Sequence, residues 1–279
     1  MGVKAFVAVA AAVAAFLGAS PLEAPSRYVE GRQAANGGFA EPGSEPTPGL
    51  TAWAVLGLRA AGRTPAQLER ARSYLERADG GLSAATDVEL ALVAWAALGD
   101  CPDPLVARVR ALIRASGAIG PTVNSTVWGV LALRACGERA PPESLRYLVR
   151  AQTRSGGWSW SLGSEPDSND TAAAVQALRS AGIGGAAIRR ATSFLRRFQN
   201  RDGGFELTEG RGSDVQSTAW VVQSFVAAGL RPPAGAFRYL ARMRRADGSY
   251  RYSARYAVTP VWVTAQALMA AARKPLPLG

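Results

Sequence analysis

The amino-acid sequence predicts an all-α protein folded as an α6/α6 toroid, a closed ring of six helical hairpins. Three observations predict it: a short glycine turn recurs six times, an amphipathic helix pattern precedes the turns, and a helix pattern that is apolar nearly all round follows them. The chain has 279 residues, of which 48% are hydrophobic and 19% charged. That length and composition suit one globular domain with a large core.

The N-terminus carries a targeting pattern. Lys4 precedes an unbroken apolar run from Ala5 to Ala19, after which the sequence turns polar. As a helix the run would span roughly 22 Å, less than the roughly 30 Å of a bilayer's hydrocarbon core. It therefore predicts a signal peptide over residues 1–22, cleaved between Ala19 and Pro25, and a secreted or cell-envelope protein with no membrane span in its mature chain. An uncleaved N-terminal anchor is the alternative.

The glycine turns define repeats spaced by about 37 to 47 residues. They read ANGGF from Ala35, ADGGL from Ala78, SGAI from Ser116, SGGW from Ser155, DGGF from Asp202 and DGSY from Asp247, with SGAI as the degenerate member. A period of this size indicates an array of supersecondary units. We expect the glycines to supply the backbone angles of the reversal, and the following large apolar residue to fill the seam between hairpins. The polar residues expected to hydrogen-bond the turn backbone are Asn36, Asp79, Asp202 and Asp247.

Helices of two kinds alternate along each repeat. Before a turn, as at Leu68, Ala71 and Leu75, apolar residues occupy one face, which predicts a half-exposed outer helix. After a turn, segments such as 125–137 and 217–229 lack a polar face and must be covered on both sides, which predicts an inner helix. The inner helices share a terminal glycine and, in three of them, a last-turn arginine, as in Gly62, Gly137, Gly182, Gly229, Arg59, Arg134 and Arg179. Closing six hairpins into a ring over residues 23–274 removes the exposed ends of an open solenoid.

The turn motifs resemble a known group. QAANGGF, QTRSGGW and QNRDGGF, which start at Gln33, Gln152 and Gln199, are similar to repeats of the squalene cyclase and protein prenyltransferase β-subunit superfamily. Related toroids occur in cobalamin carriers and complement-type thioester domains. The resemblance covers all six repeats and implies the toroid fold, but it does not specify an activity, because the superfamily includes cyclases, transferases and binding proteins.

The resemblance draws attention to a cyclase-like motif. Class II terpene cyclases carry D-x-D-D at the start of an inner helix, and this chain has DSND from Asp167 to Asp170. Asn169 stands where the proton donor would be, and a carboxamide has no ionisable proton to give. Asp167, Asp170 and Asp214 are the candidate catalytic residues. The favoured alternative is helix capping by Asp167 or Asp170, because Asp87 and Asp214 are placed at positions matching Asp167.

The other activities of the superfamily lack their residues. The chain has no histidine and only two cysteines, which excludes the zinc site of protein prenyltransferases and any histidine-based triad. The segment 135–139, ACGER, lacks the glutamine of a thioester motif. No cofactor or metal is expected. Cys101 and Cys136 align between neighbouring repeats, so in an exported protein we hypothesise a disulfide that closes a loop of about 35 residues and stabilises by roughly 3 to 4 kcal/mol.

The centre of the ring is the candidate binding site. Trp53, Trp128 and Trp220 align on three inner helices, with Trp262 nearby, and aromatic walls can hold an isoprenoid, a corrin or another large hydrophobe. The alternative is that these indoles pack between the two helix rings. Gln176, Gln223 and Gln266 are also placed at one level, where they either tie inner helices together or present amides to a ligand. Trp158 and Trp160 form either a rim platform or a seam contact.

Acidic residues and surface charge leave further alternatives. Asp87, Asp167, Asp170 and Asp214 are expected at the mouth where the inner helices begin, and a carboxylate pair there allows glycosidase chemistry as a third-ranked activity. The net charge is +11, mostly from arginine on the outer helices. This surface binds an anionic envelope polymer or lipid headgroups, or is simply a solvated basic face, which we prefer. No nucleic-acid recognition module is present, so nucleic acid is not an expected partner.

The sequence as a whole therefore predicts an exported toroid that binds a hydrophobic, isoprenoid- or corrin-like small molecule or an envelope partner without catalysis. An isoprenoid-processing, terpene cyclase-like enzyme is the alternative, and an arginine-rich cell-surface scaffold is a third. Pro275 should break the last helix, leaving residues 275–279 as a tail.

Overall fold

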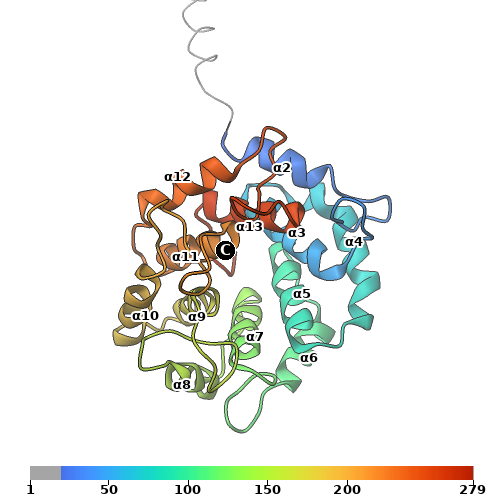
Figure 1. Ribbon diagram of the computed structural model, residues 1–279. Coiled ribbons are helices and arrows are strands. Elements are labelled where there is room, and N and C mark those ends of the chain that lie inside the picture. Colours follow the sequence, from blue (N-terminus) through green and yellow to red (C-terminus); the bar gives the residue numbers. More distant parts are fainter. Residues whose placement is uncertain (1–19, 279) are drawn as a thin grey trace, which may run out of the picture.

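Two concentric layers of helices form the protein, as the computed structural model of residues 20–278 shows (Figure 1). The inner helices are α3 (Pro48–Ala60), α5 (Ala85–Ala97), α7 (Val123–Ala135), α9 (Ser168–Ser180), α11 (Val215–Ala227) and α13 (Pro260–Ala271). The outer helices are α2 (Glu23–Glu30), α4 (Glu69–Ala78), α6 (Asp103–Ala111), α8 (Pro142–Ala151), α10 (Ala186–Arg196) and α12 (Ala234–Met243). Two 3-10 turns, η1 (Pro65–Leu68) and η2 (Asp79–Gly81), flank α4. The signal peptide predicted from the apolar run lies almost wholly outside the described residues.

The ring is closed. Each inner helix packs against the next, and α13 packs against α3, while α2 covers the junction between α13 and α3 (Figure 1). The inner helices are buried along nearly their whole length, as expected for segments without a polar face. The predicted α6/α6 toroid is therefore confirmed.

The first glycine of each regular turn makes the contact between repeats. Gly37 and Gly248 have φ values of 92° and 89°, which favour glycine. A Cβ on Gly37 would lie 2.1 Å from the carbonyl oxygen of Arg70 in α4, and one on Gly248 would lie 2.3 Å from that of Ala24 in α2. Because the last turn contacts the first outer helix in the same way that other turns contact the next one, this glycine also closes the ring.

The residue after the glycines fixes the turn to the inner helix. The side chains of Phe39 and Trp158 are buried, and their backbone N–H groups donate to the hydroxyls of Thr51 and Thr171, at 2.9 Å each. The same bond joins Ile119 to Thr126, Phe205 to Thr218 and Tyr250 to Thr264. The glutamines of the quoted motifs donate to the carbonyl of the first glycine, from Gln33 to Gly37, Gln152 to Gly156 and Gln199 to Gly203. Asn36, Asp202 and Asp247 accept turn N–H groups, as expected.

The second turn departs from the pattern. Residues Asp79–Gly81 form η2, and Asp79 Oδ2 accepts from Trp95 Nε1 at 2.6 Å instead of from the turn backbone. Inner helix α5 has Val88 where the others have threonine, so no hydroxyl is available to the N–H of Leu82. The SGAI turn, in contrast, keeps the regular geometry, with Gly117 at φ 89°. The third turn is degenerate in sequence only, whereas the second turn departs from the regular geometry because its inner helix lacks the receiving threonine.

The inner helices end as the sequence indicates, with an added contact. Gly62, Gly137, Gly182 and Gly229 follow the last turn with φ values of 89°, 73°, 81° and 72°. Arg59 Nε donates to the carbonyl of Ala97 at 2.7 Å, and Arg134 and Arg179 donate to Ser180 and Ala227 in the same way. Each arginine thus meets the C-terminal end of the next inner helix, where its charge is favourable.

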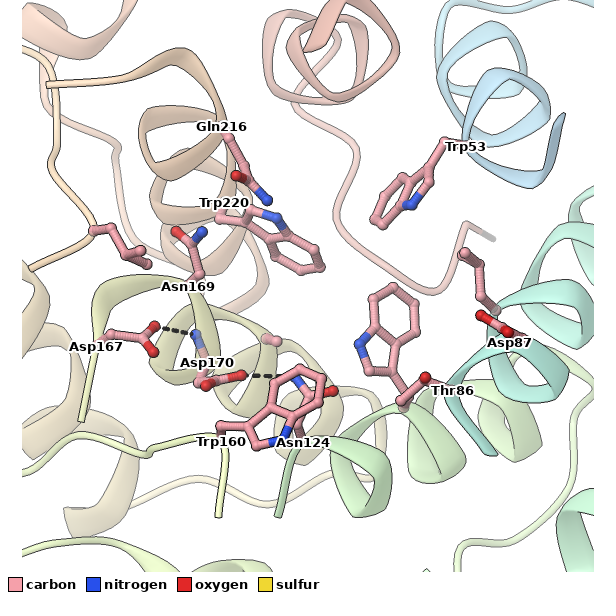
Figure 2. A pocket seen from close by; sticks show the side chains of 14 residues that line it. Trp53, Thr86, Asp87, Asn124, Trp160, Asp167, Asn169, Asp170, Gln216 and Trp220 are labelled. Carbon is pink, nitrogen blue, oxygen red and sulfur yellow. Dashed lines mark hydrogen bonds between the residues drawn. The ribbon is translucent and has the colours of Figure 1, made fainter. Parts of the chain in front are cut away.

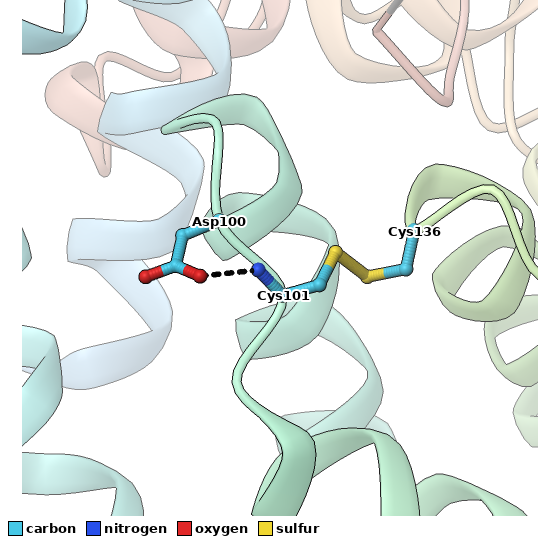
Figure 3. Close-up of a disulfide and its surroundings, with 3 residues drawn as sticks. All are labelled: Asp100, Cys101 and Cys136. Carbon is cyan, nitrogen blue, oxygen red and sulfur yellow. Dashed lines mark hydrogen bonds between the residues drawn. A yellow bond between two sulfur atoms is a disulfide. The ribbon is translucent and has the colours of Figure 1, made fainter.

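A disulfide links the second and third inner helices at this end of the ring. Cys101, in the loop after α5, is bonded to Cys136 at the end of α7, with Cα atoms 5.8 Å apart (Figure 3). The bridge spans 35 residues of sequence. Asp100 Oδ1 accepts from the N–H of Cys101 at 2.8 Å and holds the loop in place.

The C-terminal segment is part of the core. Helix α13 ends at Ala271, four residues before Pro275, and Leu276 is then 2% exposed. Its N–H donates to Gln176 Oε1 at 2.8 Å, so the segment packs against inner helix α9. Within residues 20–278, no helix is both long enough and apolar enough to cross a bilayer.

Candidate functional site: a cavity at the mouth of the toroid

A cavity of about 350 Å³ opens where the inner helices begin (Figure 2). Its lining comes from the first two turns of α3, α5, α7, α9 and α11, together with three residues that precede these helices, Trp160, Asp167 and Leu207. The lining residues are Trp53, Thr86, Asp87, Leu90, Asn124, Trp128, Trp160, Asp167, Asn169, Asp170, Ala173, Leu207, Gln216 and Trp220. The cavity therefore depends on the arrangement of the ring, because five inner helices contribute to its lining.

Three indoles form the floor. The ring centroids of Trp53, Trp128 and Trp220 are 5.7, 5.9 and 6.0 Å apart, and the rings meet at 84° to 89° (Figure 2). Such edge-to-face packing is favourable for aromatic side chains. The three side chains keep 5% to 9% of their surface exposed, whereas Gln223, one turn deeper than Trp220, keeps 2%. The indole triad thus closes the cavity and separates it from the rest of the ring axis.

Two carboxyls form one wall. Asp167 caps α9, and its Oδ1 accepts from the N–H of Asp170 at 2.8 Å (Figure 2). The Oδ1 of Asp170 accepts from Asn124 Nδ2 at 2.6 Å. Burial and the neighbouring Asp167 carboxylate raise the pKa of Asp170 to about 7, and burial also raises the pKa of Asp167. Near neutral pH Asp170 can therefore both give and accept a proton.

Asn124 leaves one acceptor without a partner. It is 8% exposed and uses its amide nitrogen on Asp170, while its Oδ1 is buried and bonded to no other described residue. Buried polar atoms are nearly always hydrogen-bonded in native proteins. Because this oxygen has almost no accessible surface, it does not face the open cavity.

Not all the candidate catalytic residues meet in the cavity. Asp167 and Asp170 line it together with the three indoles, but Asp214 does not. Asp214 is 2% exposed and caps α11 by accepting from the backbone N–H of Ser217 at 2.7 Å and from its hydroxyl at 2.9 Å. Burial raises the pKa of Asp214 to about 6. Asp214 thus caps α11 in the same way that Asp167 caps α9, and capping by Asp167 or Asp170 was the alternative that the sequence favoured.

The remaining predicted ligand residues lie outside the cavity. Gln176 Oε1 accepts from the backbone N–H of Leu276 in the C-terminal segment, and Gln223 Nε2 donates to the carbonyl of Ala219 within its own helix at 3.2 Å. Trp262 lies at the start of α13, where its backbone N–H donates to a Glu41 carboxylate oxygen at 2.9 Å, and its side chain is not part of the lining. The prediction that these three residues contact a ligand does not match the cavity, because none reaches the space above the indole floor.

Two alignments made from the sequence also change. Thr264 occupies the place of Thr218, since both accept a turn N–H, so Gln266 corresponds to Trp220 rather than to Gln223. Asp87 is the third residue of α5, just as Asp170 is the third of α9, whereas Asp167 and Asp214 precede their helices.

Sequence reasoning singled out Asn169 but missed the set of polar lining residues to which it belongs. Four inner helices carry a polar side chain at their second position that contributes to the cavity, namely Thr86, Asn124, Asn169 and Gln216. The signal is present in the sequence four residues before the level of the indoles, one helical turn away on the same face. Polar residues at that point are easily interpreted as helix-start residues, which hides their shared position.

Comparison with known proteins places the chain in a family. The model of the prenyltransferase alpha-alpha toroid domain matches residues 4–83 and 123–255, well over half of the chain. No curated protein matches.

Several solved structures share the fold. The type II terpene cyclase MstE from Scytonema, in complex with geranylgeranyl dihydroxybenzoate, is similar with a TM-score of 0.71 at 14% identity, over 91% of this chain and 96% of that one. A protein from Actinoplanes is similar with a TM-score of 0.67 at 16% identity, over 91% and 98% of the two chains. A glycosidase variant in complex with glucose has a TM-score of 0.63 at 14% identity, over 91% and 95%. At these identities the structures share the fold, and together with the family model they show that the chain belongs to the prenyltransferase alpha-alpha toroid domain family.

Proposed function

We propose that this toroid binds a compact small molecule in its mouth cavity. The observation that carries the proposal is the indole triad, which gives the cavity an apolar floor and limits it to about 350 Å³. Small-molecule sites span roughly 300 to 1,000 Å³, so this one lies near the lower end. That size favours a compact ligand over a corrin macrocycle or a long isoprenoid chain.

The fold alone supports no particular ligand. Structures with this fold hold geranylgeranyl dihydroxybenzoate in one case and glucose in another. Because one architecture serves such different molecules, the lining residues decide what is bound. Here the lining combines an apolar aromatic floor with a wall of carboxyls and amides, which fits a ligand that has both an apolar body and polar groups.

A second candidate function is acid catalysis by Asp170. The raised pKa of its carboxyl, together with its place above the indole floor, suits proton donation to a ligand double bond, with Asp170 taking the part that Asn169 cannot. The carbocation formed would then lose a proton to solvent at the open mouth to give a neutral alkene, and the Asp170 carboxylate would take a proton back from solvent. Asp170→Asn should then abolish product formation from an isoprenoid substrate while leaving the affinity for that substrate unchanged. Unchanged turnover in this variant would exclude the role.

Export to the cell envelope or medium is part of the proposal. It is supported by the apolar N-terminal run and by the Cys101–Cys136 bridge, since disulfides persist mainly in oxidising compartments. The ligand, or an envelope partner, would then be met outside the cytoplasm. Fractionation of the source cells, with the N-terminal sequence of the recovered protein, tests this directly.

The binding proposal is tested by native mass spectrometry of the protein purified from its own source, followed by denaturation to identify what is released. We expect a bound small molecule. In Ala173→Phe, which fills the cavity beside the indoles, the molecule should be lost, and in Trp262→Phe, an indole outside the cavity, it should be retained. Equal retention in both variants would refute the site.

A further inference from the structure

The mouth cavity has the opposite charge to the protein around it. The chain has 32 Lys and Arg residues against 21 Asp and Glu, and a net charge of +11. Yet among the described residues that line the cavity three are aspartates, Asp87, Asp167 and Asp170, and none is Lys or Arg. Even with one proton shared between Asp167 and Asp170, the lining stays negative. An anionic ligand would therefore be repelled at the site, although the net charge of the protein as a whole attracts anions.

The charged groups of the lining are carboxylates, which only accept hydrogen bonds when ionised. The neutral side chains of Thr86, Asn169 and Gln216 can both donate and accept. A ligand that pairs with the carboxylates must therefore bring donors or positive charge.

The floor is suited to a cation as well. Cations are attracted to an aromatic face within about 6 Å of its centroid, most strongly to tryptophan. Because the three rings are perpendicular to one another, a cation over the face of one indole lies towards the edges of the other two, so the cation–π contact comes from one ring. The cavity of about 350 Å³ is far larger than a bare ion and leaves room for alkyl groups around the charge.

We infer that the ligand is a compact organic cation, an alkylammonium group that rests on Trp53, Trp128 and Trp220 with Asp87, Asp167 and Asp170 around it. This inference deepens the proposed function and rests on it. By shape alone, the cavity would accept a neutral molecule of the same size equally well. We therefore expect the charge of the lining to discriminate between a cation and a neutral molecule.

The test uses a charged probe and its neutral isostere. Choline and 3,3-dimethyl-1-butanol have nearly the same shape and differ in the charge of the quaternary centre. The purified protein is titrated with each probe, and binding is monitored by calorimetry and tryptophan fluorescence. The affinity for choline should be at least about tenfold higher than the affinity for the alcohol. Asp87→Asn should weaken choline binding by about threefold and leave the alcohol unaffected, since Asp87 is exposed at the rim. Asp103→Asn, which makes the same change of charge on the exposed start of α6, should alter neither affinity.

The possible outcomes separate the two proposals. Equal affinities, or a preference for the alcohol, would overturn the cation inference and leave a compact neutral ligand in the same cavity. No binding of either probe would also overturn it, and native mass spectrometry of the source protein would then decide whether the cavity binds anything. An equal loss of choline affinity in Asp87→Asn and Asp103→Asn would show that overall charge, not the cavity, attracts the probe.

Discussion

Asp170→Asn should stabilise the protein in a pH-dependent way. The side chain is 8% exposed, and burial and then the Asp167 carboxylate raise the pKa of its carboxyl from 3.8 to about 7. Asparagine has the same shape, and its oxygen can still accept the hydrogen bond from Asn124 Nδ2. The substitution therefore removes the ionisation of the group without opening a hole or losing that contact.

The direction and size of the change in unfolding free energy follow from proton linkage. Between pH 3.8 and about 7 the unfolded chain loses the Asp170 proton while the folded chain keeps it, so rising pH favours unfolding. Each pKa unit corresponds to about 1.4 kcal/mol, so the wild-type protein should lose about 4 kcal/mol of unfolding free energy across this window. The variant has no ionisable group at this position, so its unfolding free energy does not decrease in this way. It should match the wild type near pH 4 and exceed it by up to about 4 kcal/mol at pH 8.

Urea unfolding of both proteins at intervals from pH 4 to pH 8, with the disulfide intact, measures the difference. Titration of Asp214 occurs in both proteins and cancels in the comparison, and Asp103→Asn serves as a control for surface charge. A constant difference between variant and wild type across this range would refute the reasoning. So would destabilisation by Asp170→Asn at pH 8.

Three further predictions concern the core, the repeats and the disulfide. Glu89 is fully buried without a hydrogen-bond partner in the described chain, and burial raises its pKa to about 9. Glu89→Gln should therefore increase the unfolding free energy at pH 7 by about 3 kcal/mol and lose that gain near pH 4. An effect that does not change with pH would contradict this. Gly248→Ala places a Cβ 2.3 Å from a backbone oxygen of α2, whereas Gly43→Ala, at a similar positive φ of 77°, places its Cβ in open space. Gly248→Ala should therefore have a much lower melting temperature than Gly43→Ala. Equal shifts in calorimetry would contradict the ring-closing role of Gly248. Replacing Cys101 and Cys136 together by serine should reduce the unfolding free energy by about 3 to 4 kcal/mol, and a loss below 1 kcal/mol in urea titration would show that the bridge constrains little.

The architecture could be predicted from the sequence because each repeat carries the same pattern of helices and turns. The Gly62-type helix ends and the glycine turns recur at regular intervals, so an error in one repeat does not change the whole. The register within a repeat was harder to predict. ADGGL at Asp79 matches the turn pattern well, yet the turn takes another shape because Val88 replaces the threonine that receives its N–H. Such a partner lies several residues away and belongs to a different element.

The candidate site was predictable only in part. The three aligned tryptophans stand out by residue type, and repetition places them at one level of the ring. Asn124 and Gln216 do not stand out, because a polar residue near a helix start has an ordinary explanation. Leu276 was assigned to a tail, since nothing in a short proline-rich segment indicates that it returns to the core and takes up Gln176.

The most direct test of the account is a crystal structure of the protein purified from its own source, without added ligand. We expect electron density for a compact molecule above Trp53, Trp128 and Trp220, beside Asp87 and Asp170, and none at the same place in Ala173→Phe. A cavity that contains only water, or a bound molecule elsewhere on the toroid, would contradict the claim that the mouth cavity is the binding site.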